Sequence, residues 1–321
     1  RQRQMCIRDR YVDLKATMTV EDALKRIRRT GPDKETINIC YVIDEGRHLL
    51  GYLSIRTILL SEEDDVVGDI MDTHVISANT LDDQEDVAQT LNKYDFLALP
   101  IVDTENRLVG IVTVDDAMDV LTEAAAEDLS IMAAVTPDEK PYFAASAWEH
   151  ARHRVVWLLI LMLSAAITGS IITRYEDAIS AVPLLVAFLP MLMDTGGNCG
   201  SQSATLVIRG LALEEIRPRD ALRVIRKELA VAAIVSAVLA AANGLRIYLQ
   251  YHDSAIALVI SLSLAATVVL AKLVGCMLPI AAKQLHMDPA IMASPLITTI
   301  VDAGAVLIYF QAAAALLRLP V

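Results

Sequence analysis

The order of apolar and polar residues divides the chain into two parts. Up to about residue 145 short apolar stretches alternate with charged ones, and beyond it long apolar runs dominate. A helix that crosses a membrane needs about 20 mostly apolar residues, and the second part offers five such runs. We therefore predict a polar domain followed by an all-α membrane domain. Its five helices are expected at residues 155–173, 178–208, 229–249, 255–278 and 291–317.

The basic residues beside these runs predict the orientation of the helices. Loops on the cytoplasmic side of a membrane carry an excess of Lys and Arg. Arg152 and Arg154 precede the first run, and six basic residues crowd the loop 209–227 between the second and third runs. The N-terminus is therefore expected in the cytoplasm and the C-terminus outside. The basic residues expected on the outer side are Arg174, Arg246 and Arg318.

The polar part contains an internal repeat. One copy includes TVEDALKRIRR and NICYVIDEGRHLLGYLSIRTIL, and the other is DQEDVAQTLNKYDFLALPIVDTENRLVGIVTVDDAMDVL. Each copy reads as an amphipathic helix, an apolar strand, a polar hairpin, a second apolar strand and a helix. The spacing from Asp44 to Gly51 equals that from Asp103 to Gly110. A repeat of this length indicates a tandem α/β module.

This duplication resembles a pair of CBS domains, small modules that often bind adenine nucleotides. In that family a Ser or Thr followed three residues later by Asp holds the ribose and phosphate. The second copy has Thr113 and Asp116 at these positions, whereas the first has Ser54 and Thr57. The resemblance implies ATP as a ligand, held by Thr113 and Asp116. The alternative is a dimerisation module without a ligand.

An acidic segment, VDDAMDVLTEAAAEDLSIMAAV, connects the repeat to the membrane part. At helical spacing Asp116, Asp119, Glu123 and Glu127 share one face, with neighbouring carboxylates about 5–6 Å apart. Like charges at this distance destabilise a helix, and bound divalent cations would relieve the repulsion. The alternative is an acidic face that is merely solvated.

One carboxylate lies deep in an apolar run. Asp302 occurs in PLITTIVDAGAVLIY, where a charge costs about 2.5–3.5 kcal/mol on insertion scales. Such a residue usually faces the interior of a helix bundle or a water-filled path. The alternative is a structural pair with Lys272 in the fourth run.

The second run contains a polar stretch, LMDTGGNCGSQSATL. Its glycines allow either close packing of helices or an unwound backbone. An unwound backbone would expose carbonyl oxygens beside Asn198, Ser201 and Gln202, a set of neutral oxygens that suits a hydrated divalent cation. Pro190 would break the helix upstream of this stretch, and Asp194 would either line the path or cap a helix.

The overall composition narrows the classes of function. The chain has 321 residues, 55% of them hydrophobic, and a net charge of −12. The acidic balance disfavours nucleic acid and favours cationic partners. No nucleophile–base pair or P-loop occurs, so an enzyme is not expected. The cysteines lack the spacing of a disulfide framework or a zinc site; they are Cys6, Cys40, Cys199 and Cys276.

Three segments together resemble the transmembrane domain of MgtE-type magnesium channels. They are PLLVAFLPMLMDTGGNCGSQSATLVIRGLA, RDALRVIRKE and LVGCMLPIAAKQLHMDPAIMASPLITTIVDAGAVLIYF. The resemblance implies a homodimer in the lipid bilayer, with five helices per subunit and one pore on the dimer axis. It places the pore carboxylate at Asp302 and pore-lining backbone carbonyls near Thr298. The remaining pore residues that it implies are Gly196, Gly197, Asn198 and Ser201, the last where the family commonly has Asn.

The resemblance also implies regulation by magnesium. In the family Mg²⁺ binds between the CBS pair, the connecting or plug helix and the membrane domain, and it holds the pore closed. When internal magnesium falls, the carboxylates repel each other and the channel opens. Ala124 replaces one family ligand. The positions that match this set are Asp95, Asp116, Asp119, Glu127, Asp128 and Asp288, and the shared helix face adds Glu123.

These interpretations give a multi-domain architecture. Residues 1–10 fit no later pattern and are expected to be a cloning remnant or a truncated start. The family's acidic helical domain that precedes the CBS pair is expected to be absent or removed. The predicted parts are a first CBS domain at 11–66, a second at 67–122, the acidic connecting helix at 123–148 and the transmembrane domain at 149–321.

The expected function is that of a magnesium-selective channel that imports Mg²⁺ across a prokaryotic plasma membrane and is closed by bound Mg²⁺. One alternative is a channel of broader selectivity that also passes Co²⁺, Ni²⁺ or Mn²⁺. Another is a CBS-regulated secondary transporter, for which Lys272 is the candidate substrate residue. A third is a membrane sensor that transports nothing.

Overall fold

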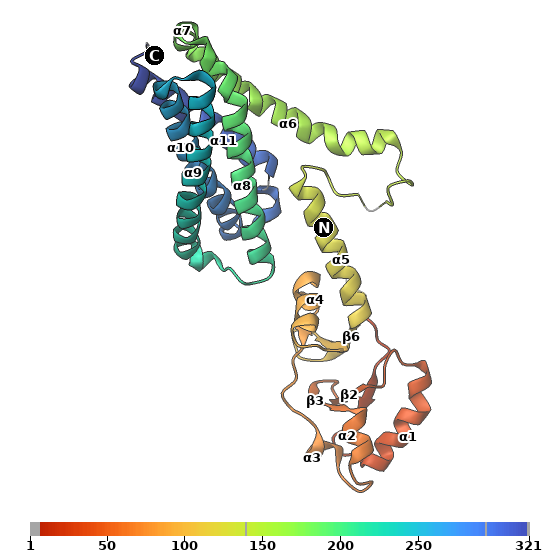
Figure 1. Cartoon of the computed structure of the whole chain (residues 1–321). Helices are drawn as coiled ribbons and strands as arrows, with labels where there is room; N and C mark the ends of the chain where they lie inside the picture. Colours follow the sequence, from red (N-terminus) through yellow and green to blue (C-terminus); the bar gives the residue numbers. More distant parts are fainter. Residues whose placement is uncertain (1–6, 139, 293, 320–321) are drawn as a thin grey trace. The chain divides into compact units, whose positions relative to one another are not determined.

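The computed structural model describes residues 7–138, 140–292 and 294–319. The chain separates into two compact units, Arg1–Ala126 and Glu127–Val321. The first unit combines sheets with helices, and the second is built of helices (Figure 1). The predicted sequence of an α/β pair followed by a helical domain is therefore confirmed.

The first unit contains two three-stranded sheets that are built alike. In each sheet the first strand runs parallel to the second, and the second runs antiparallel to the third. The register shifts at equivalent places, between Val42 and Ile43 in one sheet and between Ile101 and Val102 in the other. The duplication predicted from the sequence is thus present in three dimensions. The strands are β1 (Val12–Leu14), β2 (Ile39–Ile43), β3 (Leu49–Ser54), β4 (Ala78–Asn79), β5 (Ala98–Val102) and β6 (Leu108–Thr113).

Side-chain caps begin the two helices that precede the central strands. Thr19 accepts a hydrogen bond from the Asp22 N–H, and Asp83 accepts one from the Glu85 N–H. Such acceptors satisfy N–H groups that have no partner in the first turn of a helix. The helices of this unit are α1 (Val20–Thr30), α2 (Ile55–Leu60), α3 (Val67–Ile70), α4 (Gln84–Lys93) and the one-turn η1 (Gly31–Asp33).

The two copies share a hydrophobic core. Tyr11 and Tyr41 of the first copy pack with Leu108 and Ile111 of the second. All four side chains are buried. Because burial of large apolar side chains is the main stabilising term in folding, the pair is expected to fold as one body rather than as two separate modules.

The helix α5 (Val114–Met132) follows β6 directly. At its first residue the Val114 N–H donates a hydrogen bond to the Leu97 carbonyl at 3.0 Å. Ala117 is the only residue of this helix that is buried. The helix therefore starts nine residues before the predicted connecting helix at 123–148 and ends within it. The acidic residues assigned to that connection lie on a helix that is continuous with the last strand of the second copy.

The second unit consists mainly of long helices. Four of them, counted with any short helix that precedes them, are long and apolar enough to cross a membrane: Ala147–Arg174, Pro218–Tyr251, Ser254–Gln284 and Pro289–Leu317. These four match predicted spans. The elements are α6 (Ala147–Arg174), α7 (Glu176–Ala181), η2 (Pro183–Phe188), α8 (Leu189–Ala212), η3 (Pro218–Asp220), α9 (Ala221–Tyr251), α10 (Ser254–Gln284), η4 (Pro289–Met292) and α11 (Ser294–Leu317).

The predicted span at 178–208 differs from the structure. It is divided into α7, η2 and α8, and prolines lie at the start of both η2 and α8, where their missing N–H costs nothing. At 1.5 Å per residue the 24 residues of α8 still extend about 36 Å. Its length suffices to cross a bilayer, but its polar residues keep its hydropathy below that of the other four.

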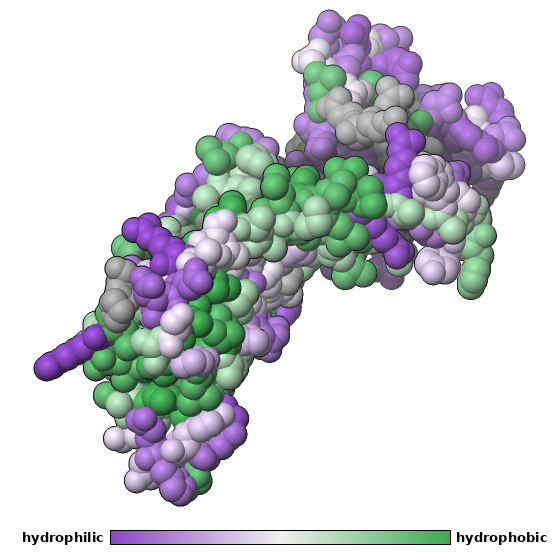
Figure 2. All heavy atoms as spheres, turned by 90° about the horizontal axis from the view of Figure 1, so that it is seen from above, coloured by the Kyte–Doolittle hydropathy of each residue, from purple (hydrophilic) through white to green (hydrophobic). Residues whose placement is uncertain are grey.

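The helices α8, α10 and α11 form the centre of the second unit, with α9 packed on α10 and α6 on α11. Outside this core, broad hydrophobic areas lie on the surface (Figure 2). On α6 they include Leu158, Leu163 and Ile167, which are 59%, 72% and 61% exposed. Apolar surface of this extent is expected of a domain whose solvent is lipid.

Candidate functional site

Glycines of α8 let it approach α10 and α11 closely. A Cβ atom at Gly197 would lie 2.9 Å from Thr298 Cγ2 of α11, and one at Gly196 would lie 2.7 Å from Thr267 Cγ2 of α10. A Cβ at Gly200 would meet Ile297 Cγ2 at 2.7 Å. Contacts this short essentially never occur for real Cβ atoms, so any larger residue at these three positions would force α10 or α11 side chains to move.

The stretch that contains these glycines is helical throughout, because α8 runs without a break from Leu189 to Ala212. The expectation of an unwound backbone is therefore wrong, and close packing is the role of the glycines. The expected break at Pro190 coincides with the first turn of α8 rather than with an interruption of it. Carbonyl oxygens inside the helix accept the usual i+4 hydrogen bonds, so side chains supply most of the free oxygens.

Polar side chains line one face of α8. Asp194, Asn198 and Gln202 follow each other at intervals of four residues, and all three are exposed. On α11 Thr298 and Asp302 are also four residues apart and partly exposed. Residues at this spacing lie one above the other on a helix.

The two faces form one polar strip. The contact between Gly197 and Thr298 sets α8 against α11 at the level of Asn198. The Asp194 carboxylate acts electrostatically on Asp302, so the two acids lie close to each other. The hydroxyl of Thr298 donates to the Pro295 carbonyl at 2.9 Å. Ser201 follows on the same helix and is half-buried. We call Asp194, Asn198, Gln202, Thr298 and Asp302 the polar strip.

Lys272 does not neutralise Asp302. Across residues 7–138, 140–292 and 294–319, no ion pair joins either residue to an opposite charge. The Lys272 side chain is 4% exposed and its charge acts on Cys199. The structural pair considered as an alternative is therefore wrong, and the carboxylate of Asp302 is left for another cation.

The polar strip provides carboxylate and amide oxygens, the donors that Mg²⁺ prefers. Within the part of the chain that the structure describes, no group of three or more His, Cys, Asp or Glu side chains is arranged to hold a metal. A magnesium ion sheds its water reluctantly and needs few direct protein ligands. The strip therefore suits a hydrated ion in passage better than a tightly caged one.

Part of the predicted regulatory set lies in the first unit. Asp95 is exposed and adopts a φ of 54° in the turn after α4. The hydrogen bond from Val114 to Leu97 places this turn beside the first turn of α5, which carries Asp115 and Asp116, and Asp119 lies in the next turn. Glu123 lies farther along the same helix. The structure thus places the turn that carries Asp95 beside the acidic start of α5, and a shared cation site there stays a prediction.

Asp116 already has a cationic partner. The guanidinium of Arg8 donates to both of its carboxylate oxygens, each at 2.9 Å, and the Thr113 hydroxyl donates to one of them at 3.1 Å. Arg8 also pairs with Glu35 at 2.7 Å, and these two acids raise the pKa of Arg8. Sequence reasoning missed Arg8 because it lies among the residues 1–10 that fitted no pattern. Residues 1–6 lie outside the described part.

The other part of the regulatory set lies in the second unit. Asp128 is half-buried, and its pKa is raised by burial and by the charges of Asp288 and Glu127. Asp288 accepts a hydrogen bond from the Ala290 N–H at 2.8 Å and thereby begins η4. Three of the predicted regulatory acids are therefore brought together, without a basic residue among them.

We expect Asp128→Asn to raise the melting temperature in magnesium-free buffer at pH 7 by about 2 °C, after allowance for solvent screening. Because the pKa of Asp128 is raised in the folded protein, the folded protein binds this proton more readily than the unfolded chain does. The difference applies at pH values between the ordinary pKa of aspartate and the raised pKa. In the wild type this contribution therefore stabilises the fold as pH falls through that window, and it is lost as pH rises. The variant lacks this pH dependence. Differential scanning fluorimetry against pH measures both effects.

Saturating magnesium is expected to remove the difference between Asp128→Asn and the wild type, because bound cations relieve the same repulsion. Asp64→Asn is the control, since Asp64 is exposed in a loop of the first unit. An equal shift in both variants would show that general charge, not the contact with Asp288, is responsible.

A small pocket lies between the two copies of the first unit. Both copies line it, through residues that include Tyr41, Tyr52, Phe96 and Pro100. Ile39 of the lining pairs with Ser54 across the sheet, and the Ser54 and Thr57 hydroxyls lie 2.8 Å apart. Its walls are aromatic and apolar, but its volume of about 40 Å³ is well below that of a nucleotide site, so a base could enter only if the walls move apart. This pocket adjoins Ser54 and Thr57 of the first copy. Of the predicted nucleotide residues, Asp116 is bound by Arg8, and the Thr113 hydroxyl donates to Asp116.

Two families match the chain. The MgtE divalent cation transporter family matches residues 189–312, and the CBS domain matches residues 6–63 and 67–123. The magnesium transporter MgtE of Thermus thermophilus is 41% identical over 308 residues, which cover 96% of this chain and 68% of that protein. The magnesium transporter MgtE of Bacillus subtilis is 39% identical over 314 residues, which cover 97% and 68%.

Solved structures also resemble the first unit. The cytosolic domain of the Mg²⁺ channel MgtE in complex with ATP is 46% identical and matches with a TM-score of 0.35, covering 36% of this chain and 46% of that one. The soluble part of a magnesium transporter is 42% identical with a TM-score of 0.37, covering 37% and 47%.

Proposed function

Since the chain belongs to the MgtE family of divalent cation transporters, we propose that it carries Mg²⁺ across a membrane along the polar strip of α8 and α11. This chain aligns with 68% of the length of each of these two relatives, and both relatives are magnesium transporters. The observation that carries the proposal is the carboxylate of Asp302, which lies within a spanning helix and has no cationic partner among residues 7–138, 140–292 and 294–319. A permeating cation would balance this negative charge inside the membrane and would account for the presence of Asp302 there.

A second copy of the chain completes the path. In one chain the polar strip is exposed on the side of the helix bundle, and a carboxylate facing lipid costs several kcal/mol, roughly 2.5–3.5 on insertion scales. A two-fold partner that presents the same strip would enclose it around water. We infer a homodimer with its pore on the dimer axis, to which each chain contributes Asp302, Thr298, Asn198, Ser201 and the glycines that hold α8 in place.

Magnesium itself closes the path in this proposal. Internal Mg²⁺ binds the regulatory acids, and its loss lets their repulsion open the pore. A shift of a gate from 1:99 to 99:1 requires about 5.5 kcal/mol, which several weak sites acting together supply. The acids assigned to this role are Asp95, Asp116, Asp119, Glu123, Glu127, Asp128 and Asp288.

The distribution of basic residues supports a location in a prokaryotic plasma membrane with the N-terminus in the cytoplasm and the C-terminus outside. The segment 209–227, which runs from the last turn of α8 to the first two turns of α9, contains six Lys and Arg residues. The ends of α6 and α9 on the other side contribute Arg174 and Arg246. This asymmetry follows the positive-inside rule.

ATP is proposed as a ligand of the pocket lined by Tyr41, Tyr52 and Phe96. The pocket offers flat apolar walls for the base, and Ser54 beside it offers a hydroxyl for the ribose. Isothermal titration of the whole chain with ATP should show binding that Phe96→Ala weakens by about tenfold, since stacking contributes roughly 1–1.5 kcal/mol. Equal binding by the variant would remove the assignment.

Flux through the purified protein tests the transport function. The full chain is reconstituted into liposomes that hold a fluorescent Mg²⁺ indicator, and external Mg²⁺ is added. We expect influx that slows as internal Mg²⁺ rises. Absence of flux would favour a sensor. Flux of Co²⁺, Ni²⁺ or Mn²⁺ at the same rate would favour a channel of broader selectivity, and flux of an organic anion dependent on Lys272 would favour a secondary transporter.

A further inference from the structure

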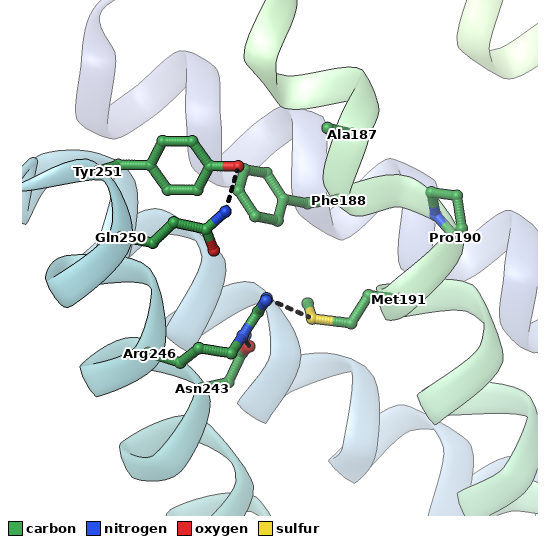
Figure 3. Close-up of a pocket in the computed structure, with 8 residues that line it drawn as sticks. All are labelled: Ala187, Phe188, Pro190, Met191, Asn243, Arg246, Gln250 and Tyr251. Carbon is green, nitrogen blue, oxygen red and sulfur yellow. Dashed lines mark hydrogen bonds between the residues drawn. The ribbon is translucent and has the colours of Figure 1, made fainter.

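A pocket lies where the last turns of α9 meet the start of α8 (Figure 3). Its volume is about 490 Å³. It belongs to the second unit alone, and none of its lining residues is a member of the polar strip. The lining residues are Ala187, Phe188, Pro190 and Met191 from η2 and α8, and Asn243, Arg246, Gln250 and Tyr251 from α9.

Arg246 brings an uncompensated positive charge into this pocket. Its Nε donates to Asn243 Oδ1 at 3.1 Å, and its Nη2 lies 3.9 Å from the Met191 sulfur. An amide oxygen and a thioether are neutral acceptors, and the thioether is a weak one. In the stretches 7–138, 140–292 and 294–319, Arg246 forms no ion pair. None of the lining residues is acidic.

Asn243 adds a second unsatisfied donor. Its Oδ1 accepts from Arg246, while its Nδ2 is buried and has no hydrogen-bond partner in the structure. A buried N–H without an acceptor costs about 1–3 kcal/mol. The Gln250 side chain donates to the Tyr251 hydroxyl at 3.2 Å, and the Tyr251 ring packs edge-on against Phe188. The pocket therefore presents the Arg246 guanidinium beside the aromatic rings of Phe188 and Tyr251, and no carboxylate among its lining residues balances that charge.

The surroundings of the pocket are those of a membrane interface. Arg246 lies five residues before the end of the spanning segment Pro218–Tyr251. Tyr248 and Tyr251 are 50% and 38% exposed at the same end, as is typical of the aromatic belt at the level of lipid headgroups. On the same turns Leu245 and Leu249 are 61% and 62% exposed, which provides apolar surface for acyl chains.

We propose that this pocket binds the phosphate group of a phospholipid in the outer leaflet, with Arg246, oriented by the Asn243 carbonyl oxygen, as its cationic anchor. A guanidinium matches phosphate oxygens with paired hydrogen bonds. The exposed leucines beside the pocket favour a phosphate that carries acyl chains over a free ion. The inference goes beyond the proposed function. It requires that α9 spans the membrane, and the assignment to the outer leaflet rests on the orientation proposed above.

Native mass spectrometry of the whole protein, purified in mild detergent and titrated with phosphatidylglycerol, tests the site. We expect Arg246→Gln to weaken binding of the most tightly held lipid by about tenfold or more, the loss expected for one charged hydrogen-bonded contact. Arg174→Gln is the matched control, because Arg174 ends α6 on the same side of the membrane and lies outside the pocket. Equal lipid binding by wild type and Arg246→Gln would overturn the proposal.

Asn243→Asp separates loss of the site from loss of the fold. The new carboxylate would lie beside the Arg246 guanidinium and neutralise the pocket from within, so the variant should lose the lipid while its melting temperature rises. Retention of the lipid by this variant would count against the site.

Two further ligands test whether the pocket binds a phospholipid rather than another lipid or a free phosphate ion. A galactolipid with the same acyl chains and no phosphate is expected to bind at least tenfold more weakly than phosphatidylglycerol, and inorganic phosphate alone is expected not to displace the lipid at millimolar concentration. Equal binding of the galactolipid would exclude recognition of phosphate. Displacement by inorganic phosphate would assign the pocket to a free anion and exclude the lipid.

Discussion

Asp302→Ala is expected to reduce magnesium flux into liposomes by about 100-fold or more. The side chain supplies the carboxylate of the polar strip on α11, and no cation of the described residues compensates it. If its attraction lowers the barrier to a hydrated divalent ion by about 2.7 kcal/mol, its loss costs two orders of magnitude in rate. The substitution also removes a charge that is costly within a membrane, so the protein should fold at least as well.

Two companion variants sharpen this experiment. Asp302→Asn keeps the size and the hydrogen-bonding capacity of the side chain and removes its charge, so it should resemble Asp302→Ala if electrostatic attraction is the cause. Asp177→Asn is the control, because Asp177 is exposed on the short helix α7. Flux at the wild-type rate in Asp302→Ala, with the protein still folded, would remove this carboxylate from the path.

Gly275→Ala is expected to destabilise the second unit by about 1–3 kcal/mol, the usual cost of overpacking, and to abolish flux. A Cβ at Gly275 of α10 would lie 3.0 Å from the carbonyl carbon of Gly200 in α8 and closer still to its oxygen. Backbone atoms cannot move aside as a flexible side chain can. The two helices would have to separate, and Asp194 and Asn198 on α8 would move with them.

The control for this substitution is Gly169→Ala on α6. A Cβ at Gly169 would meet no atom within 4 Å, so the variant gains helix propensity without a clash and should be neutral or slightly stabilising. Thermal unfolding in detergent and flux in liposomes measure both variants. A melting temperature for Gly275→Ala equal to that of the wild type would contradict the close contact of α8 and α10.

Local pattern was sufficient for most of the fold. Short runs of apolar residues predicted the strands of both copies, because the central strands are buried on both faces. Equal spacing from Asp44 to Gly51 and from Asp103 to Gly110 predicted their duplication. Four spanning helices followed from unbroken apolar runs. The polar second span was harder, since prolines divide it and its low hydropathy reflects the residues that line the strip.

The candidate site could be predicted only in part. Asp302 was identifiable because a carboxylate in an apolar run has few structural explanations. The sequence around Gly196, Gly197 and Gly200 could not by itself predict whether this stretch is helical or unwound. The outcome depends on whether α10 and α11 leave enough space for α8 to pack closely against them. The partner of Asp116 was missed for a similar reason, since Arg8 is more than a hundred residues away in sequence and no short motif marks it.

The contact of Gly200 with Gly275 has a consequence for how the family can vary. The distance between α8 and α10 is set by two main chains that touch, so it does not depend on the size of the side chains around them. Side chains of the polar strip can then be exchanged without altering the distance between α8 and α10. In the proposed path, ion preference can change by such exchanges while the packing of the two helices stays the same.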